Sequence, residues 1–376
     1  MHDLEQIQEL LGALGRPYQA GDVAAAMKQL GEFVTDEAVL SVMERLRRNS
    51  VGAGPLEDLL REPGVSDVVV NGPAAVFVDR GAGLEPAPVS FLDGEQVRRL
   101  AIRLAAAAGR RLDDAQPFVD GRLPDGTRLH AALAPVAAPG TCISLRVPAS
   151  RTFSLMDLTE AGSVTPEIAH VLSTLVARKV PFLVSGGTGS GKTTLLAALL
   201  AAVPSHERIV LVEDARELVP NHPHCVRLEG RPPNAEGEGG LPLAELVRQS
   251  LRMRPDRVVL GEVRGAEITD LLRALNTGHE GGCATIHANS VEDVPARLEA
   301  LAALGGMSRE ACHAQVAAAL RVVVHVRRWP SGERRVDQIG VIRRSNQVEV
   351  ASAWRFTPGG YVACEAAAEL EDLLCG

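Results

Sequence analysis

The sequence has few aromatic residues and no surplus of basic charge. Phe, Trp and Tyr together make up 3% of its 376 residues, so side chains on which single-stranded bases could stack are scarce. The formal net charge is −8 at pH 7, whereas most nucleic-acid binders use a basic surplus to neutralise phosphates. No nucleic-acid partner is expected on these grounds.

Long apolar runs and paired cysteines are also missing. The longest apolar run, residues 195–203, is less than half of the roughly 20 residues that a membrane-crossing helix needs. The first ten residues, MHDLEQIQEL, carry acids where a signal peptide carries basic residues. The six cysteines are scattered without a C-x-x-C pair, which argues against a disulfide framework or a zinc ribbon. We therefore expect a cytoplasmic protein that acts at a membrane only through a partner.

The chain length and its changing hydrophobic pattern predict two domains and a helical extension. Residues 1–54 carry apolar side chains at helical spacing and form the predicted extension. Residues 55–150 are predicted to form a small α+β domain, with a hairpin in the segment VSDVVVNGPAAVFVDR and a helix over 95–109. Residues 151–164 are expected to be a linker.

Residues 165–376 alternate apolar strands with helices. The segments PFLVSG, RIVLVED, RVVLGE and CATIHA are predicted strands, and helices are predicted at 193–203, 243–253, 267–276 and 291–304. This alternation predicts an α/β domain whose mostly parallel sheet is covered by helices on both faces. Three further strands are predicted to form a β-rich tail after the last of these helices.

A glycine-rich motif opens the first helix of this domain. The sequence GGTGSGKTT follows an apolar strand and matches the phosphate-binding pattern G-x-x-x-x-G-K-[ST]. Lys192 is one of only three lysines, against 36 arginines, so its place in the motif is hard to ascribe to chance. We expect it to reach the β- and γ-phosphates of a nucleotide, and the Thr193 hydroxyl to bind Mg²⁺. The expected phosphate-binding residues are Gly186, Gly187, Thr188, Gly189, Ser190, Gly191, Lys192, Thr193 and Thr194.

Glu262 lies seventy positions after Lys192 and is predicted to stand just beyond a buried strand in the segment RVVLGEVRG. We expect its strand to lie beside the strand of the phosphate-binding loop, so that the carboxylate points at the γ-phosphate. A carboxylate in that place can orient or deprotonate the attacking water. A helix-capping or surface glutamate is the alternative interpretation.

Two further polar segments adjoin predicted strands. Glu213 and Asp214 end a strand in RIVLVEDARE and could hold Mg²⁺ through its water ligands, although a solvated strand end is the alternative. The segment GHEGGCATIHAN contains His279, Cys283 and His287. A strand separates the two histidines, so their spacing differs from that of a helix-borne metal pair. A phosphate-sensing loop is therefore favoured over core histidines or a metal site.

Four segments together resemble a known family. GGTGSGKTT, VEDARELV, LRMRPDRVVLGEVRGAE and TGHEGGCATIHANS occur in this order and resemble the Walker A, acidic, Walker B and histidine boxes of the secretion ATPase superfamily. The segments VVVNGPAAVFVDR and GRRLDDAQPFVDGRLPDGTRLHAAL narrow this resemblance to the CpaF-like ATPases of Tad/Flp pilus and related type II/IV secretion systems. It covers roughly residues 55–345 and implies a RecA-like P-loop ATPase domain, a homo-hexamer and an inner-membrane platform protein as partner.

The resemblance also implies roles for individual residues. It implies ATP and Mg²⁺ as ligands, and two arginines of the N-terminal domain that reach the γ-phosphate, with Arg122 as a competing candidate. The implied catalytic residues are Glu262, Lys192, Arg128, Arg146, His279 and His287, and the implied acidic box is Glu213 and Asp214.

Two residues differ from related motifs, and one further segment lies outside the four boxes. Gly261 precedes Glu262 where many other P-loop enzymes carry an aspartate, so direct Mg²⁺ binding by such an aspartate is not assumed. Arg216 is a variation within the acidic box, and no effect is predicted for it. Residues 321–344 hold seven arginines and two acids. A solvated strand surface is favoured there over a contact with an acidic partner or anionic lipid.

These features predict a hexameric ATPase motor that powers pilus assembly or protein secretion at the inner face of the cell membrane. Mg·ATP is expected to bind between the N-terminal and RecA-like domains, and its hydrolysis to shift one against the other. A retraction or conjugative-transfer ATPase, a nucleic-acid translocase and a nucleotide-binding scaffold with negligible turnover are the rival functions.

Overall fold

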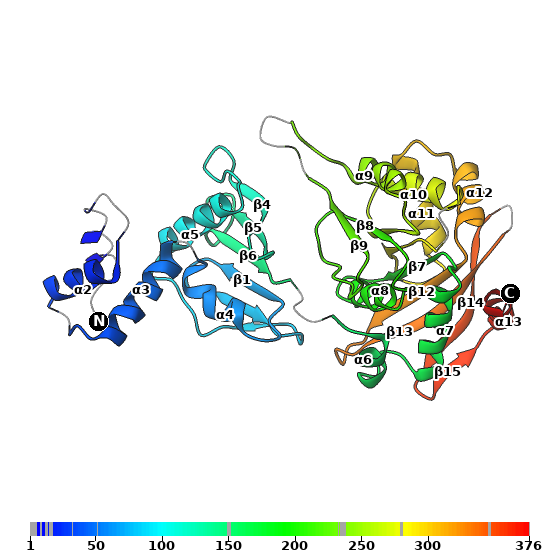
Figure 1. The fold of residues 1–376 in the computed structure, drawn as a ribbon, viewed down its shortest axis with the longest axis horizontal. Helices are drawn as coiled ribbons and strands as arrows, with labels where there is room; N and C mark the ends of the chain where they lie inside the picture. The colour runs from blue at the N-terminus through cyan, green and yellow to red at the C-terminus, as the bar shows by residue number, and fades with distance from the viewer. Residues whose placement is uncertain are drawn as a thin grey trace. The chain divides into compact units, whose positions relative to one another are not determined.

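The computed structural model describes residues 6–7, 10–11, 14, 18–31, 33–50, 52–148, 152–231, 233, 238–278, 281–344 and 347–375. The chain forms two compact units, Met1–Ala149 and Ser150–Gly376 (Figure 1). Within the residues given above, no helix is long and apolar enough to cross a membrane.

In the N-terminal part of the first unit, helices α2 (Ala20–Gln29) and α3 (Asp36–Ser50) pack on each other. Their helical form agrees with the apolar spacing of this part of the sequence. Asp22 in the first turn of α2 and Asp36 in that of α3 suit the positive ends of the helix dipoles. The two helices share a small core with two residues that precede α2, and this core consists of Ile7, Leu11, Val23, Ala26, Met27, Val39, Val42 and Leu46.

The rest of the first unit is a six-stranded antiparallel sheet with helix α5 packed against it, over a second hydrophobic core. The predicted hairpin is confirmed, since β1 and β2 pair antiparallel with Val68 opposite Val78. The strand order is β3-β2-β1-β6-β5-β4. Its elements are η1 (Gly54–Leu56), α4 (Glu57–Arg61), β1 (Asp67–Asn71), β2 (Val76–Asp79), β3 (Leu84–Pro86), α5 (Gly94–Ala107), β4 (Phe118–Arg122), β5 (Arg128–Ala132) and β6 (Cys142–Arg146).

The second unit alternates helices and strands as far as β12 and then continues as an antiparallel tail. Its helices are α6 (Leu155–Glu160), α7 (Pro166–Ala177), α8 (Lys192–Ala201), α9 (Leu243–Ser250), η2 (Leu251–Met253), α10 (Glu267–Leu275), α11 (Val294–Leu304), α12 (Arg309–Ala319) and α13 (Ala367–Cys375). Its strands are β7 (Phe182–Gly186), β8 (Ile209–Glu213), β9 (Cys225–Glu229), β10 (Arg257–Val263), β11 (Cys283–His287), β12 (Val322–Arg328), β13 (Arg334–Arg343), β14 (Glu349–Thr357) and β15 (Gly360–Ala363).

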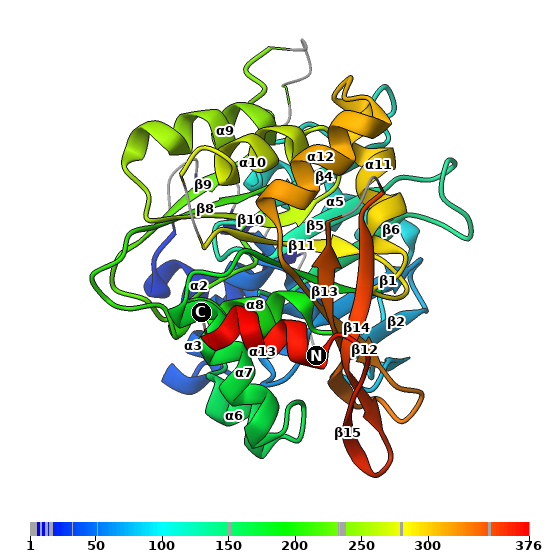
Figure 2. The same cartoon turned by 90° about the vertical axis from the view of Figure 1, so that its right-hand side faces the viewer.

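The nine strands form one sheet in the order β15-β14-β13-β12-β7-β11-β10-β8-β9. From β12 to β9 every neighbouring pair is parallel, whereas β13, β14 and β15 add antiparallel strands at the other end. Helices α6, α7, α8 and α13 cover one face, and α9 to α12 cover the other (Figure 2). The predicted parallel α/β sheet with helices on both faces is therefore confirmed.

One predicted neighbour relation is wrong. The strand of Glu262, β10, does not lie beside β7, because β11 pairs with both and stands between them. Parallel strands are joined by crossovers over a helix, so sequence order does not fix which strands become neighbours. Glu262 also lies within β10 rather than beyond its end.

A buried ion pair ties β10 to the loop before β8. Arg257, at the start of β10, has an exposed fraction of 1%, and its Nε lies 2.7 Å from the Glu207 carboxylate. The same guanidinium donates a hydrogen bond to the Val176 carbonyl at the end of α7. Lys179 lies 3.4 Å from the other Glu207 oxygen. A charge buried this deeply needs its partner, because an uncompensated ion in the interior is very unfavourable.

Glu207→Ala leaves the Arg257 guanidinium buried without a carboxylate. We expect it to lower the free energy of unfolding of the second unit by about 3–5 kcal/mol. Both tryptophans, Trp329 and Trp354, lie in this unit, so denaturant unfolding followed by tryptophan fluorescence reports on it alone. The control is Glu369→Ala, which removes an exposed partner of Arg343 and should leave the midpoint nearly unchanged. Equal midpoints for both variants would contradict the role given to the buried pair.

Candidate nucleotide-binding and catalytic site

The glycine-rich motif forms a tight loop between β7 and α8. Every residue of β7 is buried, and the loop leaves the sheet at Gly186. A Cβ on Gly186 would lie 2.2 Å from the Val326 carbonyl oxygen of β12, so only glycine fits there. Gly191 precedes α8 in the left-handed conformation, with φ of 100°, which also favours glycine. The loop therefore places the N-terminus of α8 directly beyond a buried strand, the arrangement that binds phosphate groups.

Lys192 is buried at the start of α8 and folds back over the loop. Its Nζ donates hydrogen bonds to the carbonyls of Gly186, at 3.1 Å, and Gly187, at 2.8 Å. Burial lowers the pKa of its ammonium group, and the nearby Glu262 carboxylate partly opposes this shift. Gly187, Thr188 and Gly189 are exposed, so the loop backbone is accessible to a ligand.

The donors around this loop fit a phosphate chain. The hydroxyl of Ser190 is buried and has no hydrogen-bond partner among the described residues. Thr193 and Thr194 lie half-buried in the first turn of α8. Backbone amides at a helix N-terminus, an ammonium group and hydroxyls are the groups that bind nucleotide phosphates and their Mg²⁺.

Glu262 and His287 meet at the same edge of the sheet. Parallel pairing of β10, β11 and β7 brings Glu262 of β10 beside His287 at the end of β11, which pairs with Gly186. His287 Nε2 lies 2.6 Å from Glu262 Oε1, and Arg264 lies 2.5 Å from the other Glu262 oxygen. Arg264 also pairs with Asp214 at 3.2 Å. One connected polar cluster thus joins the predicted Walker B, histidine and acidic boxes.

The cluster favours a neutral imidazole at His287. Burial lowers the pKa of His287, and the positive charge of Lys192 lowers it further, while Glu262 acts in the opposite direction. The Glu262 carboxylate acts on the pKa of both Lys192 and His287, and Lys192 acts on the pKa of His287, so the three side chains share one electrostatic environment. A neutral imidazole has one N–H donor and one acceptor nitrogen.

Glu213 explains why a glycine stands before Glu262. The Glu213 side chain has an exposed fraction of 3%, and a Cβ on Gly261 would lie 2.7 Å from its Cγ and 3.4 Å from its Oε1. The Glu213 side chain therefore occupies the space that the Cβ of an aspartate at 261 would need. Glu213 Oε1 accepts hydrogen bonds from the amides of Glu217 and Leu218, and Oε2 lies 3.4 Å from Arg227. Burial raises the pKa of Glu213, and these donors oppose the shift.

Both oxygens of Glu213 thus have donors in this arrangement, whereas the Asp214 side chain is about half exposed, at 54%. Of the acidic pair, Asp214 is the better placed for a metal-bound water. The role of both residues in binding Mg²⁺ stays a prediction.

The other predicted residues fall in different places. His279 lies outside the described residues. Cys283 is fully buried in β11, and burial raises the pKa of its thiol to about 12, so it is protonated and a poor metal ligand. No group of three or more His, Cys, Asp or Glu side chains with the geometry of a metal site is found in the part of the chain that the structure describes.

The three N-terminal arginines come together within the first unit. Arg122, Arg128 and Arg146 lie directly opposite one another across β4, β5 and β6, so their side chains share one face of the sheet. Arg146 also pairs with Asp67 of β1 at 3.0 Å. The row therefore groups three cations on that face, with Asp67 opposite Arg146 as the next residue in the row.

Sequence reasoning missed two residues of the site. Arg264 lies two positions after Glu262, on the same side of an extended chain, and this spacing could have identified it. Arg334 of β13 donates a hydrogen bond from its Nε to the Gly189 carbonyl at 2.9 Å. Because 145 positions separate this pair, the sequence carries no local signal for it.

The fold and the loop define a P-loop protein with a RecA-like α/β domain. The family comparison agrees, since the profile of the family "Type II/IV secretion system protein" matches residues 49–368. The chain belongs to this family.

Individual relatives match most of the chain. A protein of Mycobacterium tuberculosis (strain ATCC 25618 / H37Rv), whose name refers to conjugal transfer, is 52% identical over 346 residues, covering 90% of this chain and 97% of the relative. The type IV secretion system protein VirB11 of Brucella suis is 31% identical over 320 residues, covering 78% of this chain and 88% of VirB11.

Solved structures support the same fold. The ATPase DotB of Legionella pneumophila has a TM-score of 0.54 at 20% identity and covers 81% of this chain and 80% of its own. The pilus retraction motor PilT with bound ADP has a TM-score of 0.53 at 19% identity, covering 84% of each chain. At these identities the likeness shows the fold alone.

The electrostatics of the cluster predict how His287 titrates. We expect the pKa of His287 to lie below the ordinary value of about 6.5, to rise in Lys192→Met and to fall further in Glu262→Gln. NMR titration of histidine-labelled protein measures this, with His287→Gln to assign the signal. Since the unfolded chain binds this proton at higher pH than the folded one, His287 lowers stability as the pH falls below about 6.5. A pKa in the wild type above that value, or no change in Lys192→Met, would contradict the geometry.

Proposed function

We propose that this protein is an ATP hydrolase that works as a homo-hexameric motor, powering pilus assembly or protein secretion through an inner-membrane platform protein. In this proposal it is cytoplasmic and reaches the inner face of the membrane through that partner. One observation carries the enzymatic part: Glu262 and His287 lie at the same sheet edge as a phosphate-binding loop that contains Lys192. The family membership supports the secretion role.

The proposed reaction uses the residues of this cluster in order. The loop amides and Lys192 bind the phosphates of ATP, and Lys192 exchanges its carbonyl contacts for phosphate oxygens. Glu262 orients or deprotonates the attacking water, and its hydrogen bond to His287 fixes the position of the carboxylate. Bound Mg²⁺ would neutralise charge on the phosphates, held by Thr193 and, through water, by Asp214 and Glu213.

The finer assignments belong to the same proposal. Arg128 and Arg146 stabilise charge on the γ-phosphate in the transition state, and His279 acts with His287 as the histidine box. The finer division into an extension (1–54), an N-terminal domain (55–150), a linker (151–164) and a motor domain (165–376) is retained as well.

A second candidate is a motor for conjugative transfer or retraction. The name of the relative that is 52% identical refers to conjugal transfer, and this favours conjugative transfer over retraction. All these motors would use the same nucleotide site, so the site does not discriminate between them. Turnover that rises with single-stranded DNA, and not with the platform protein, would instead favour a nucleic-acid translocase.

Two substitutions separate hydrolysis from binding. We expect Glu262→Gln to bind ATP normally but to lower kcat by about 10²–10⁴-fold, because the amide cannot act as a base. Lys192→Ala should lose ATP binding as well as turnover. Phosphate release and ATP-binding assays measure both, with the exposed Glu369→Gln and Lys28→Ala as matched controls.

Equal turnover in the wild type and both variants would remove the motor function. ATP binding without turnover in the wild type would leave a nucleotide-binding scaffold.

Substitutions in the arginine row test whether residues of the first unit contribute to ATP hydrolysis. We expect Arg128→Ala and Arg146→Ala each to lower kcat by about 10³-fold, since a cation at the γ-phosphate contributes on that order. ATP affinity should change little. Arg122→Ala tests the competing candidate, and Arg61→Ala, which breaks an exposed pair with Glu57, is the control. Unchanged kcat in both Arg128→Ala and Arg146→Ala would remove these residues from the mechanism.

A further inference from the structure

The β12–β13 hairpin brings two arginines to the phosphate-binding loop. Arg334 Nε donates a hydrogen bond to the Gly189 carbonyl at 2.9 Å, and its Cδ lies 3.5 Å from the place that a Cβ on Gly191 would take. Arg328 Nη1 lies 3.8 Å from the position that a Cβ on Gly189 would take. The exposed outer part of the loop therefore has two guanidinium groups beside it.

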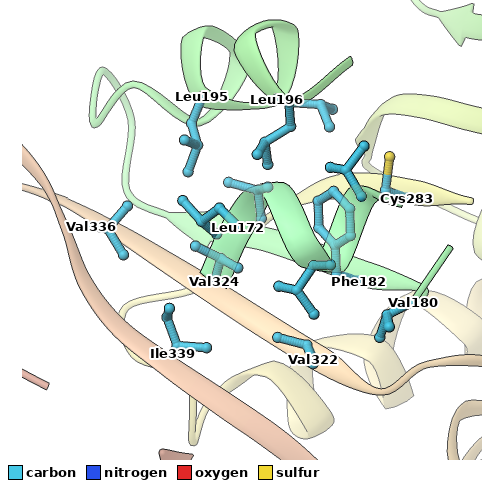
Figure 3. Packing of buried hydrophobic residues seen from close by; sticks show 14 of the residues in the cluster. Leu172, Val180, Phe182, Leu195, Leu196, Cys283, Val322, Val324, Val336 and Ile339 are labelled. Atoms are coloured by element: carbon cyan, nitrogen blue, oxygen red, sulfur yellow. The ribbon is translucent and has the colours of Figure 1, made fainter. Parts of the chain in front are cut away.

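The strand register puts these two arginines on one face. Arg328 and Arg334 are directly opposite each other in the antiparallel pair, so their side chains lie side by side. Farther from the turn, Val326 and Val336 are also opposite each other, in the core beneath α8. Figure 3 shows Val324 and Val336 in this core together with Leu195 and Leu196 of α8. The face of the β12–β13 hairpin that packs beneath α8 therefore also carries Arg328 and Arg334, nearer the turn.

The neighbouring arginines have a different environment. Arg327 and Arg335 are also opposite each other, one residue away and so on the other face. The Arg327 guanidinium stacks over Trp329 at 4.8 Å, and that of Arg335 over Phe356 at 5.0 Å. Arg335 also pairs with Glu333 at 3.1 Å. Aromatic rings and a carboxylate therefore stabilise this second pair, which gives a matched control on the same hairpin.

Two like charges directly opposite each other in a sheet repel. An anion beside the pair offsets that repulsion, and a phosphate chain in the adjacent loop is such an anion. Arg334 forms no ion pair with a carboxylate among the described residues, and guanidinium groups match phosphate oxygens in a two-pronged geometry. We propose that Arg328 and Arg334 form a second, cationic wall of the nucleotide site and contact the α- and β-phosphates of bound ADP or ATP.

This inference deepens the proposed function, because it rests on nucleotide binding by the loop but not on hydrolysis. It also changes the interpretation of part of the arginine-rich segment, from a solvated surface to a ligand contact. A tether that only holds the loop, through the Arg334 bond to Gly189, is the competing account.

MgADP binding by the full-length protein, measured by titration calorimetry, tests the pair. We expect Arg334→Gln and Arg328→Gln each to bind MgADP about tenfold more weakly, the order expected when one charge-assisted hydrogen bond is lost. Arg334→Lys, which retains the charge but not the two-pronged geometry, should recover part of the affinity. Arg335→Gln should bind as the wild type does. The affinity of Arg334→Gln should also fall less steeply with added salt, because one cation no longer contacts the phosphates.

Thermal unfolding of each variant checks that the fold is intact. MgADP affinity equal to that of the wild type in both glutamine variants would overturn the inference. The inference would also be overturned if Arg334→Gln bound MgADP as tightly as the wild type while Arg334→Lys bound it more weakly. That is the result expected if Arg334 only holds the loop through a neutral hydrogen bond. A wild type that binds no MgADP would instead refute the proposed function itself, and the two failures are therefore distinguishable.

Discussion

The parallel pairing of β7, β11 and β10 is the constraint on which the site depends. Parallel strands end at one edge of a sheet, so the loop at Gly186, the imidazole of His287 and the carboxylate of Glu262 come together although they are far apart in the sequence. The 2.6 Å contact between Glu262 and His287 joins two of these strands directly. Lys192, at the start of α8, lies in the same electrostatic environment.

Local patterns predicted most of the elements and the loop. GGTGSGKTT specified its own strand, turn and helix, because glycine at Gly186 and Gly191 is required by close approach and by positive φ. The neighbour of β7 was not predictable, since the order of parallel strands depends on crossovers and not on local residues. Helix α6 lies within the segment expected to be a linker, because its length of six residues gives almost no periodic signal. The fit between Gly261 and Glu213 depends on packing between strands that the sequence does not show.

The arginines of residues 321–344 illustrate the same limit. A count of seven arginines against two acids favoured a solvated strand surface. The structure separates them by strand register: Arg343 pairs with Glu365 and Glu369 near α13, and Arg334 contacts the loop. Charge density gives the sign of the local potential, whereas register decides which ligand or carboxylate each cation meets.

The central claim is that Lys192 and Glu262 act on one triphosphate held by the loop. A structure of the wild-type protein with Mg²⁺ and a non-hydrolysable ATP analogue tests it most directly. The account predicts that Lys192 Nζ leaves the carbonyls of Gly186 and Gly187 for the β- and γ-phosphate oxygens. It also predicts that Glu262 holds a water beside the γ-phosphate. A bound analogue whose phosphates lie away from Lys192, with Glu262 directed elsewhere, would contradict the account.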